Sequence, residues 1–396
     1  MHLCVRLPKI ESSVIEPPAQ CPLRHPKTHR RCTGRHFKLH QRLCVKRVRD
    51  LKHAKVMAHR YRCLKCQRTF RVYPQGVSND QQSDSLKALS VLLYVMGLSY
   101  QGVVDLLTAL EQPLSLGTVL ANVQAAGKKA RRLRGAWVKG QAGQVKVMGI
   151  DCTRVKCLTQ ELIVAVATNI VTGAPLTIDV LRAETAMQLT AWIQDLAKQL
   201  GVEILVTDDA DNMKIVADDL GLQHQICRAH VNRNVHDLVA ALGTKALEHP
   251  DRVPWELPGL TVEQFLEDVQ TVEELIKGLH HDGQAQMTAL AARYQGAPPP
   301  PQGGRASMWY RMRLLTLDWS ENWARLTLFQ RWRSPTKQKL DGTNNASEQV
   351  IGHCIKERYR TMRGYKRKPS ILNVSGLTGW LWIQRTDYDM GAVVRD

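Results

Sequence analysis

Three acidic residues have the side chains and the positions to act together on bound metal ions. Asp151 and Asp208 each end a short apolar, β-branched segment, and Glu348 lies early in a later helical segment. Carboxylates that cluster without basic partners repel one another unless a cation lies between them, and such oxygen ligands suit Mg²⁺ or Mn²⁺. Two of these ions can activate a water or a 3′-hydroxyl and stabilise the leaving oxygen of a phosphodiester. The three acids therefore predict metal-dependent cleavage and joining of DNA strands, with two divalent ions per active site.

The identity of the second acid has an alternative. Asp209 and Asp211 follow Asp208 closely, and either could be an acid at the start of a helix, where negative charge is favourable. An Asp after a strand is also commonly a turn or capping residue. Asp209 is therefore the substitute for Asp208, and the prediction depends on the combination of all three acids.

The segments that carry the acids follow the order of a ribonuclease H-like domain. Three short β-branched segments come first, and helical and strand-like segments then alternate. This order predicts an α/β fold with a mixed sheet, in which the first and fourth strands are neighbours and bring Asp151 and Asp208 together. The predicted elements are strands at 145–150, 162–168, 175–181, 203–207 and 224–227, and helices at 184–200 and 212–220.

An α-helical insertion is predicted before the segment that contains Glu348. No further strand pattern is evident between about 231 and 340, where helical periodicity occurs at 262–279 and 285–294. A helix at 345–360 follows and could carry Glu348 back over the end of the sheet.

Cysteines in the N-terminal part have spacing that could form a zinc site. Cys63 and Cys66 form a C-x₂-C knuckle, which needs a second pair of ligands for a tetrahedral Zn²⁺ site. Cys21 begins a plausible second pair and Cys32 could complete it, with His25 as the competitor. The alternative is a set of reduced cysteines without metal in a basic arm.

The charge of the chain indicates a polyanionic partner. The 396 residues include 55 Lys and Arg against 36 Asp and Glu, and residues 1–75 hold 19 of the basic residues but only three of the acidic ones. This balance is typical of nucleic-acid binding, and 44% hydrophobic residues exclude wholesale disorder. No apolar run reaches the length that a bilayer needs, and the first residues lack the pattern of a signal peptide. We therefore expect a cytoplasmic, nucleoid-associated protein without a membrane partner and with reduced cysteines.

Helices after the basic N-terminal segment favour a helix-turn-helix. Ser83, Ser99 and Ser115 are good N-cap residues, and each precedes an apolar helical pattern. The segment 115–132 could enter a major groove, and a second basic stretch at 356–368 would flank the active site. The predicted DNA-binding residues are Arg35, Lys38, Arg68, Arg71, Lys128, Arg131, Lys356, Arg358, Arg363 and Lys366.

The acids and their surroundings resemble those of one enzyme family. Asp151, Asp208 and the segment 343–364 that contains Glu348 are similar to motifs of DDE transposases of bacterial insertion sequences, related to the Mutator-like group. The resemblance extends from about residue 21 to 382. It implies an enzyme that binds terminal inverted repeats, hydrolyses the element ends and joins the freed 3′-hydroxyls to target DNA. The three acids would hold its divalent ions.

The same resemblance bears on two further pairs of residues. Transposases of this kind often carry an N-terminal zinc ribbon, which favours Cys32 over His25 as the fourth zinc ligand. Their Cys-x-x-His pair after the second acid corresponds to Cys227 and His230. The role of that pair is open between a structural or DNA-positioning element and the alternative of a buried Cys with a capping His.

The predicted organisation has three parts. These are a basic zinc-ribbon module at 1–78, a helix-turn-helix domain at 79–140 and a ribonuclease H-like catalytic domain at 141–396. Because two element ends must be cut together, we expect a homodimer or higher oligomer on DNA. One alternative is a domesticated transposase acting as a DNA-binding regulator, although the presence of all three acids argues against loss of catalysis. Another is a structure-specific nuclease or resolvase on the same fold, which uses the same metal site.

Overall fold

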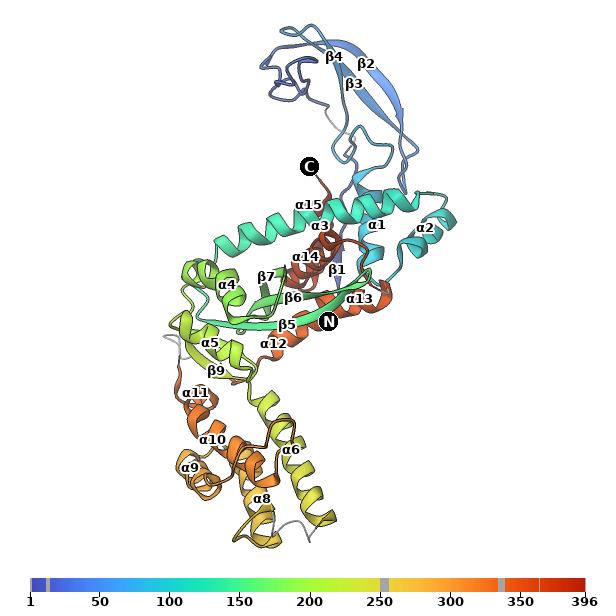
Figure 1. Cartoon of the computed structure of the whole chain (residues 1–396). Helices are drawn as coiled ribbons and strands as arrows, with labels where there is room; N and C mark the ends of the chain where they lie inside the picture. The colour runs from blue at the N-terminus through green and yellow to red at the C-terminus, as the bar shows by residue number, and fades with distance from the viewer. Residues whose placement is uncertain (1, 12–14, 250–255, 334–338, 363, 396) are drawn as a thin grey trace. The chain divides into compact units, whose positions relative to one another are not determined.

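The computed structural model describes residues 2–11, 15–249, 256–333, 339–362 and 364–395 (Figure 1). They fall into two compact units, which we describe separately. Unit 1 comprises Met1–Trp137, Val155–Leu162 and Gly352–Asp396, and unit 2 comprises Val138–Arg154 and Ile163–Ile351. Among the described residues, no helix combines the length and the apolar character that crossing a membrane requires.

The N-terminal part of unit 1 contains an antiparallel sheet with the strand order β2-β3-β4 (Figure 1). In β3, buried Val56 and Ala58 alternate with exposed residues, as expected of a strand with one covered face. A small apolar cluster of Cys21, Cys63 and Phe70 lies where β3 ends and β4 begins. The strands of unit 1 are β2 (Phe37–Arg47), β3 (Lys55–Cys63) and β4 (Thr69–Val72), together with the parallel pair β1 (Cys4–Arg6) and β10 (Asp387–Asp389).

The helices predicted after this sheet are confirmed. The side chain of Ser83 accepts a hydrogen bond from the N–H of Leu86, and that of Ser99 accepts one from the N–H of Gly102, so both serines are N-caps. The third helix continues without a break through the basic stretch after Gly127. A helix-turn-helix domain stays a prediction. The helices are α1 (Asp84–Val95), α2 (Tyr100–Ala109) and α3 (Leu116–Lys139).

The predicted mixed α/β sheet is confirmed, and it lies mainly in unit 2. Its strand order is β7-β6-β5-β8-β9. Strand β8 is parallel to both β5 and β9, whereas β6 and β7 are antiparallel to each other, so the sheet is mixed. Helices connect the parallel strands, as parallel pairing requires. The elements are β5 (Val147–Cys157), β6 (Gln160–Asn169), β7 (Ala174–Leu181), α4 (Ala186–Leu200), β8 (Ile204–Thr207), α5 (Asp211–Asp219) and β9 (Gln223–Ile226).

The prediction that Asp151 ends the first strand is wrong. Strand β5 continues for six residues beyond it, to Cys157. After Asp151, buried Thr153 and Val155 alternate with exposed basic residues, which is the pattern of a strand with one covered face. Asp151 therefore lies within a strand.

The predicted α-helical insertion is confirmed. Its helices enclose their own apolar core, which includes Phe265, Tyr294, Trp319 and Trp323. The carboxylate of Asp268 is buried in this core, accepts a hydrogen bond from the Tyr294 hydroxyl at 2.7 Å and pairs with an arginine. The insertion therefore has internal packing that can hold it as a rigid part of unit 2. Its helices are α6 (Arg228–Glu248), α8 (Val262–Gly278), α9 (Gly283–Tyr294), α10 (Met308–Leu326) and α11 (Leu328–Arg331).

The predicted helix at 345–360 forms with an irregular middle. The segment is an α-helix, then a π-helical turn, then an α-helix again. π-helical turns inside α-helices occur frequently at functional sites. The elements are α12 (Asn345–Val350), η2 (Ile351–Lys356) and α13 (Glu357–Met362), followed in unit 1 by α14 (Lys368–Gln384) and α15 (Met390–Val394).

Candidate active site and metal centres

Two of the three predicted acids lie on neighbouring parallel strands of unit 2. Strand β5 pairs with β8 in a register that sets Gly149 opposite Val206. Continuing this register sets Asp151 level with Asp208, which directly follows β8. The two aspartates therefore lie level with each other on neighbouring inner strands of the sheet.

The pKa of Asp151 reflects the charges of the other two acids. Burial raises the pKa of Asp151 to about 6, with further increases from the negative charges of Asp208 and Glu348 and opposing effects of the Cys152 N–H and His230. Burial also raises the pKa of Asp208. Buried carboxylates that repel one another favour a cation between them. The donor set of hard oxygen atoms fits Mg²⁺ or Mn²⁺.

The other acids near Asp208 have different partners. Asp209 Oδ1 and Oδ2 each accept a hydrogen bond from Asn234 Nδ2 at 3.4 Å. Asp211 pairs with Lys214 at 3.1 Å. The charges of Asp208 and Glu348 raise the pKa of Asp151, whereas the charge of Asp209 raises that of Asp208. This arrangement favours Asp208 over Asp209 as the second acid.

Asn344 fixes the helix that carries Glu348, a role that sequence reasoning missed. It is buried directly before α12, and its side-chain Nδ2 donates a hydrogen bond to the carbonyl of Ile150 at 2.9 Å. Its backbone N–H donates to Cys227 Sγ at 3.2 Å. These bonds tie the start of α12 both to the residue before Asp151 and to the Cys-x-x-His segment. The signal in the sequence was an Asn at a helix start, which indicates only a cap.

Gly149 allows α12 to approach strand β5 closely. A Cβ atom at this position would lie 2.5 Å from Asn344 Oδ1 and would collide with Ser347 Oγ and with Ile170. Ser347 directly precedes Glu348 on α12. A larger residue would therefore displace these side chains, two of which belong to the segment that carries Glu348.

The His230 side chain contacts Glu348, and the Cys227 thiol lies close to both. Nε2 of His230 lies 3.2 Å from Glu348 Oε1. The hydrogen bond with Cys227 raises the pKa of His230 to about 9, against the effect of burial. Burial opposes ionisation of the Cys227 thiol, but His230 and the N–H groups of His230 and Asn344 lower its pKa. The Cys-x-x-His motif thus places a polarised thiol–imidazole pair beside Glu348.

A buried histidine supports the strand end that carries Asp208. His224 in β9 is 5% exposed, and its Nε2 lies 2.8 Å from the Thr207 hydroxyl. Burial, with the positive charge of Arg325, lowers its pKa from 6.5 to about 3. His224 is therefore neutral in the folded protein at pH values where an exposed histidine gains a proton.

This histidine predicts a loss of stability in acid. Below pH 6.5 the unfolded chain binds a proton at His224 that the folded chain refuses until about pH 3. The free energy of unfolding should therefore decrease as the pH is lowered from 6.5 to about 3, by up to about 1.4 kcal/mol per pH unit. Urea unfolding of wild type and His224→Gln at several pH values isolates this effect from other titrations. A difference between the two proteins that does not change with pH would contradict the prediction.

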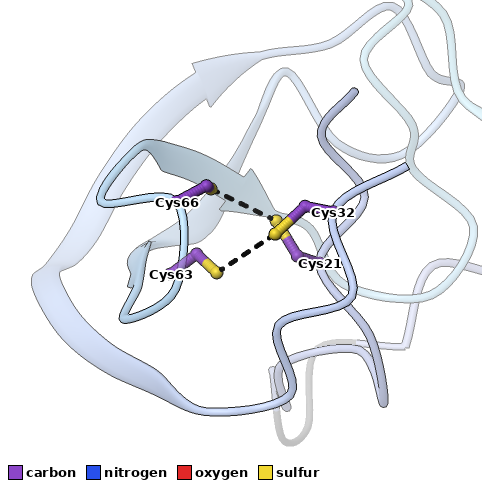
Figure 2. Close-up of side chains that lie close together, drawn as sticks. All are labelled: Cys21, Cys32, Cys63 and Cys66. Carbon is purple, nitrogen blue, oxygen red and sulfur yellow. Dashed lines mark hydrogen bonds between the residues drawn. The ribbon is translucent and has the colours of Figure 1, made fainter. Parts of the chain in front are cut away.

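Four cysteine side chains of unit 1 converge on one point (Figure 2). The Sγ atoms of Cys21 and Cys66 are 3.9 Å apart, and those of Cys32 and Cys63 are 3.8 Å apart. All four Sγ atoms lie within 4.8 Å of one another. Tetrahedral Zn²⁺ with Zn–S bonds of about 2.3 Å separates its sulfur ligands by about 3.8 Å. The four cysteines thus fit a Zn²⁺ ion.

The cluster also bears on the choice of the fourth ligand. Cys32 belongs to it, whereas Nδ1 of His25 accepts a hydrogen bond from the N–H of Thr28 at 3.3 Å. Burial opposes ionisation of Cys63, but the N–H groups of Cys66 and Lys65 lower the pKa of its thiol to about 7. This arrangement favours Cys32 over His25 as the fourth zinc ligand. It also makes Cys63 a cysteine that readily becomes the thiolate that zinc binds.

The predicted DNA-binding residues have different environments. Arg358 is 2% exposed, stacks 4.1 Å from the centre of the Tyr94 ring and donates a hydrogen bond to the carbonyl of Leu98. Its assignment to a phosphate-binding surface is therefore wrong. Arg131 is half-buried, and Arg363 lies outside the described residues. The exposed members of the set are Arg35, Lys38, Arg68, Arg71, Lys128, Lys356 and Lys366.

Comparisons with known proteins give only remote similarity. No protein-family model matches the sequence, and no curated protein matches it. The catalytic core domain of HTLV-2 integrase in complex with magnesium, in its dimeric form, is 14% identical with a TM-score of 0.18, and the match covers 33% of this chain and 84% of that one. The catalytic core domain of BIV integrase has the same identity and TM-score, with coverages of 52% and 99%. With such low scores, neither similarity indicates what this chain does.

Proposed function

We propose that this chain is a DDE transposase, which cleaves DNA at the ends of a mobile element and joins the ends to target DNA. The observation that carries the proposal is the register that sets Asp151 level with Asp208 on adjacent strands of a mixed sheet, with Glu348 near enough for its charge to raise the pKa of Asp151. The effect of the Asp208 and Glu348 charges on Asp151 supports a shared role of the three acids in binding cations. Phosphodiester chemistry by two divalent ions requires such a set of carboxylates.

The residues around the acids have separate tasks in this proposal. When bound, Mg²⁺ or Mn²⁺ ions activate the attacking water or 3′-hydroxyl and stabilise the charge on the leaving oxygen. Asp151 and Asp208 hold the ions from the sheet, and Glu348 completes the site from α12. His230 orients the Glu348 carboxylate through their 3.2 Å contact, and Asn344 fixes the start of the helix. Preorganised ligands of this kind avoid reorganisation during the reaction.

Binding of element ends is proposed for the basic parts of unit 1. Exposed Arg35, Lys38, Arg68 and Arg71 lie close in the sequence to cysteines of the cluster, and exposed Lys128 lies on α3. Such residues can neutralise phosphates and release counterions, which makes binding strongly salt-dependent. The proposed partners are inverted-repeat ends and target DNA, with assembly of a dimer or higher oligomer on them in the bacterial cytoplasm. The division into parts at 1–78, 79–140 and 141–396 belongs to this proposal.

The test uses the full chain, Mg²⁺ or Mn²⁺, and a DNA fragment that carries the sequence flanking its own gene. We expect cleavage at a defined terminus, followed by joining of the 3′ end to a second DNA. Cleavage without joining would overturn the proposal in favour of a nuclease or resolvase. Tight binding without metal-dependent cleavage would overturn it in favour of a DNA-binding regulator.

Gly149→Ala is expected to slow cleavage about 100-fold, because a displacement of about 1 Å at a reacting centre can have this effect. The added methyl group would force α12 away from β5 and move Glu348 relative to Asp151. The measurements are the single-turnover cleavage rate and the melting temperature. Gly135→Ala is the matched control, since nothing lies within 4 Å of a Cβ at that position. A wild-type rate for Gly149→Ala would refute the importance of this close approach.

A further inference from the structure

The Cys227, His230 and Glu348 side chains form a group whose chemistry differs from that of the carboxylates alone. Each offers one ligand atom, and these atoms lie within 4.8 Å of one another. In the described part of the chain, this group and the cluster of four cysteines are the two sets of Cys, His and acidic side chains with such spacing. Both α6, which begins after Cys227, and α12 belong to unit 2, so that one compact unit supplies the whole group.

The ligand types favour a thiophilic cation over Mg²⁺. A thiolate and an imidazole are poor ligands for Mg²⁺, whereas Zn²⁺ binds sulfur, nitrogen and carboxylate oxygen in one tetrahedral site. Three protein ligands with one open position is a common arrangement for zinc. The separation of 3.2 Å between His230 Nε2 and Glu348 Oε1 is compatible with two ligands of one small ion.

The surroundings of Cys227 would stabilise its side chain as a thiolate that binds a metal ion. The thiol is fully buried, and the backbone N–H of Asn344 donates to its Sγ at 3.2 Å. Hydrogen bonds of this kind orient a metal ligand and stabilise its charge. Oε1 of Glu348, the oxygen that faces His230 Nε2, is also buried and makes no hydrogen bond among the described residues. The group thus contains a shielded sulfur and a buried carboxylate oxygen that no hydrogen-bond donor satisfies.

We propose that Cys227, His230 and Glu348 form a second Zn²⁺ site, separate from the cluster of four cysteines, which withdraws Glu348 from the catalytic ions. The inhibitory part rests on the proposed function, because it requires Glu348 to serve catalysis. The Glu348 carboxylate then has two competing uses. It binds Mg²⁺ together with Asp151 and Asp208, or it binds Zn²⁺ together with the Cys227 thiol and the His230 imidazole. Zinc beyond the first equivalent inhibits strand cleavage, and added Mg²⁺ relieves the inhibition.

The first arm of the test measures metal binding without reference to activity. Full-length protein that contains one Zn²⁺ per chain is titrated with Co²⁺, whose thiolate charge-transfer and tetrahedral d–d absorption bands report the ligands. We expect one further equivalent in wild type and in Cys4→Ser, a control that removes an exposed thiol outside both groups. Cys227→Ser should lose the added charge-transfer band and bind at least about 100-fold more weakly.

Further variants keep the result independent of folding. His230→Gln should retain the thiolate band but weaken Co²⁺ binding, and Glu348→Gln should do the same. Circular dichroism and melting temperature identify any variant that fails to fold. The variants that fold then decide whether the second metal site exists. Absence of a second equivalent in wild type would overturn the proposal, as would an unchanged band in folded Cys227→Ser.

The second arm measures DNA cleavage at fixed Mg²⁺ while Zn²⁺ is increased. Wild type should be inhibited at the concentrations that fill the second site, with a midpoint that rises with Mg²⁺. Inhibition at unrelated concentrations would overturn the regulatory part. If wild type cleaves no DNA under any condition, the proposed function fails, whereas the cobalt titration still decides whether the second site exists.

Discussion

Replacing Asp151 or Asp208 by Asn, or Glu348 by Gln, is expected to reduce the rate of DNA strand cleavage at least about 1,000-fold. Each change removes a negative oxygen ligand from a site whose charges already act on one another. A 1,000-fold decrease corresponds to about 4 kcal/mol of lost transition-state stabilisation. Binding of the DNA fragment, measured in Ca²⁺ or without a divalent ion, should stay within a few-fold of wild type. Single-turnover cleavage rates and binding isotherms on the same fragment check both expectations.

The neighbouring acids supply the matched controls for this series. Asp209→Asn and Asp211→Asn remove the same charge one and three positions further on, but their carboxylates are partnered with Asn234 and Lys214. We expect each control to keep a rate within about fivefold of wild type, since exposed or partnered charges contribute little to a site that they do not contact. A large loss in Asp209→Asn with a normal rate in Asp208→Asn would exchange the roles of these two residues.

The sheet could be predicted from the sequence because the buried part of each strand is rich in apolar residues and recognisable helices separate the later strands. The end of β5 could not be placed, since the half-buried part after Asp151 carries polar and basic residues on its exposed face. The π-helical turn at Ile351–Lys356 was also missed. An apolar period of 3.6 residues does not distinguish a single π turn from a regular helix.

The residues that position the acids lie beyond what local patterns can reveal. Asn344 bonds to the carbonyl of Ile150, 194 positions away, and Gly149 is required by a helix that follows the whole insertion. Neither contact leaves a signal in nearby residues, because both depend on how the sheet and α12 pack. The prediction that Arg358 binds DNA was wrong for a related reason. A run of basic residues predicts an exposed surface, but the tertiary fold buries this one against Tyr94.

Removal of zinc from the cysteine cluster is the second large effect that we expect. The apolar cluster around Cys21, Cys63 and Phe70 is small, and so few buried groups cannot fold a segment without further support. A structural Zn²⁺ ion contributes about 10–16 kcal/mol in small zinc modules. Cys63→Ser should therefore lower the zinc content from about one per chain to near zero and unfold the segment around β2, β3 and β4.

The consequences of zinc loss should differ between the two units. Because exposed basic residues lie on the same segment as the cluster cysteines, DNA affinity should fall at least about 100-fold, while the helical signal of unit 2 persists. Zinc content by mass spectrometry of the metal, hydrogen exchange by peptide and DNA binding at several salt concentrations measure these three effects. Cys4→Ser is the control, since this exposed cysteine lies outside the cluster. Purified wild type without zinc, or a Cys63→Ser/Cys227→Ser double variant with the zinc content of wild type, would mean that the four sulfur atoms lie together without a structural metal.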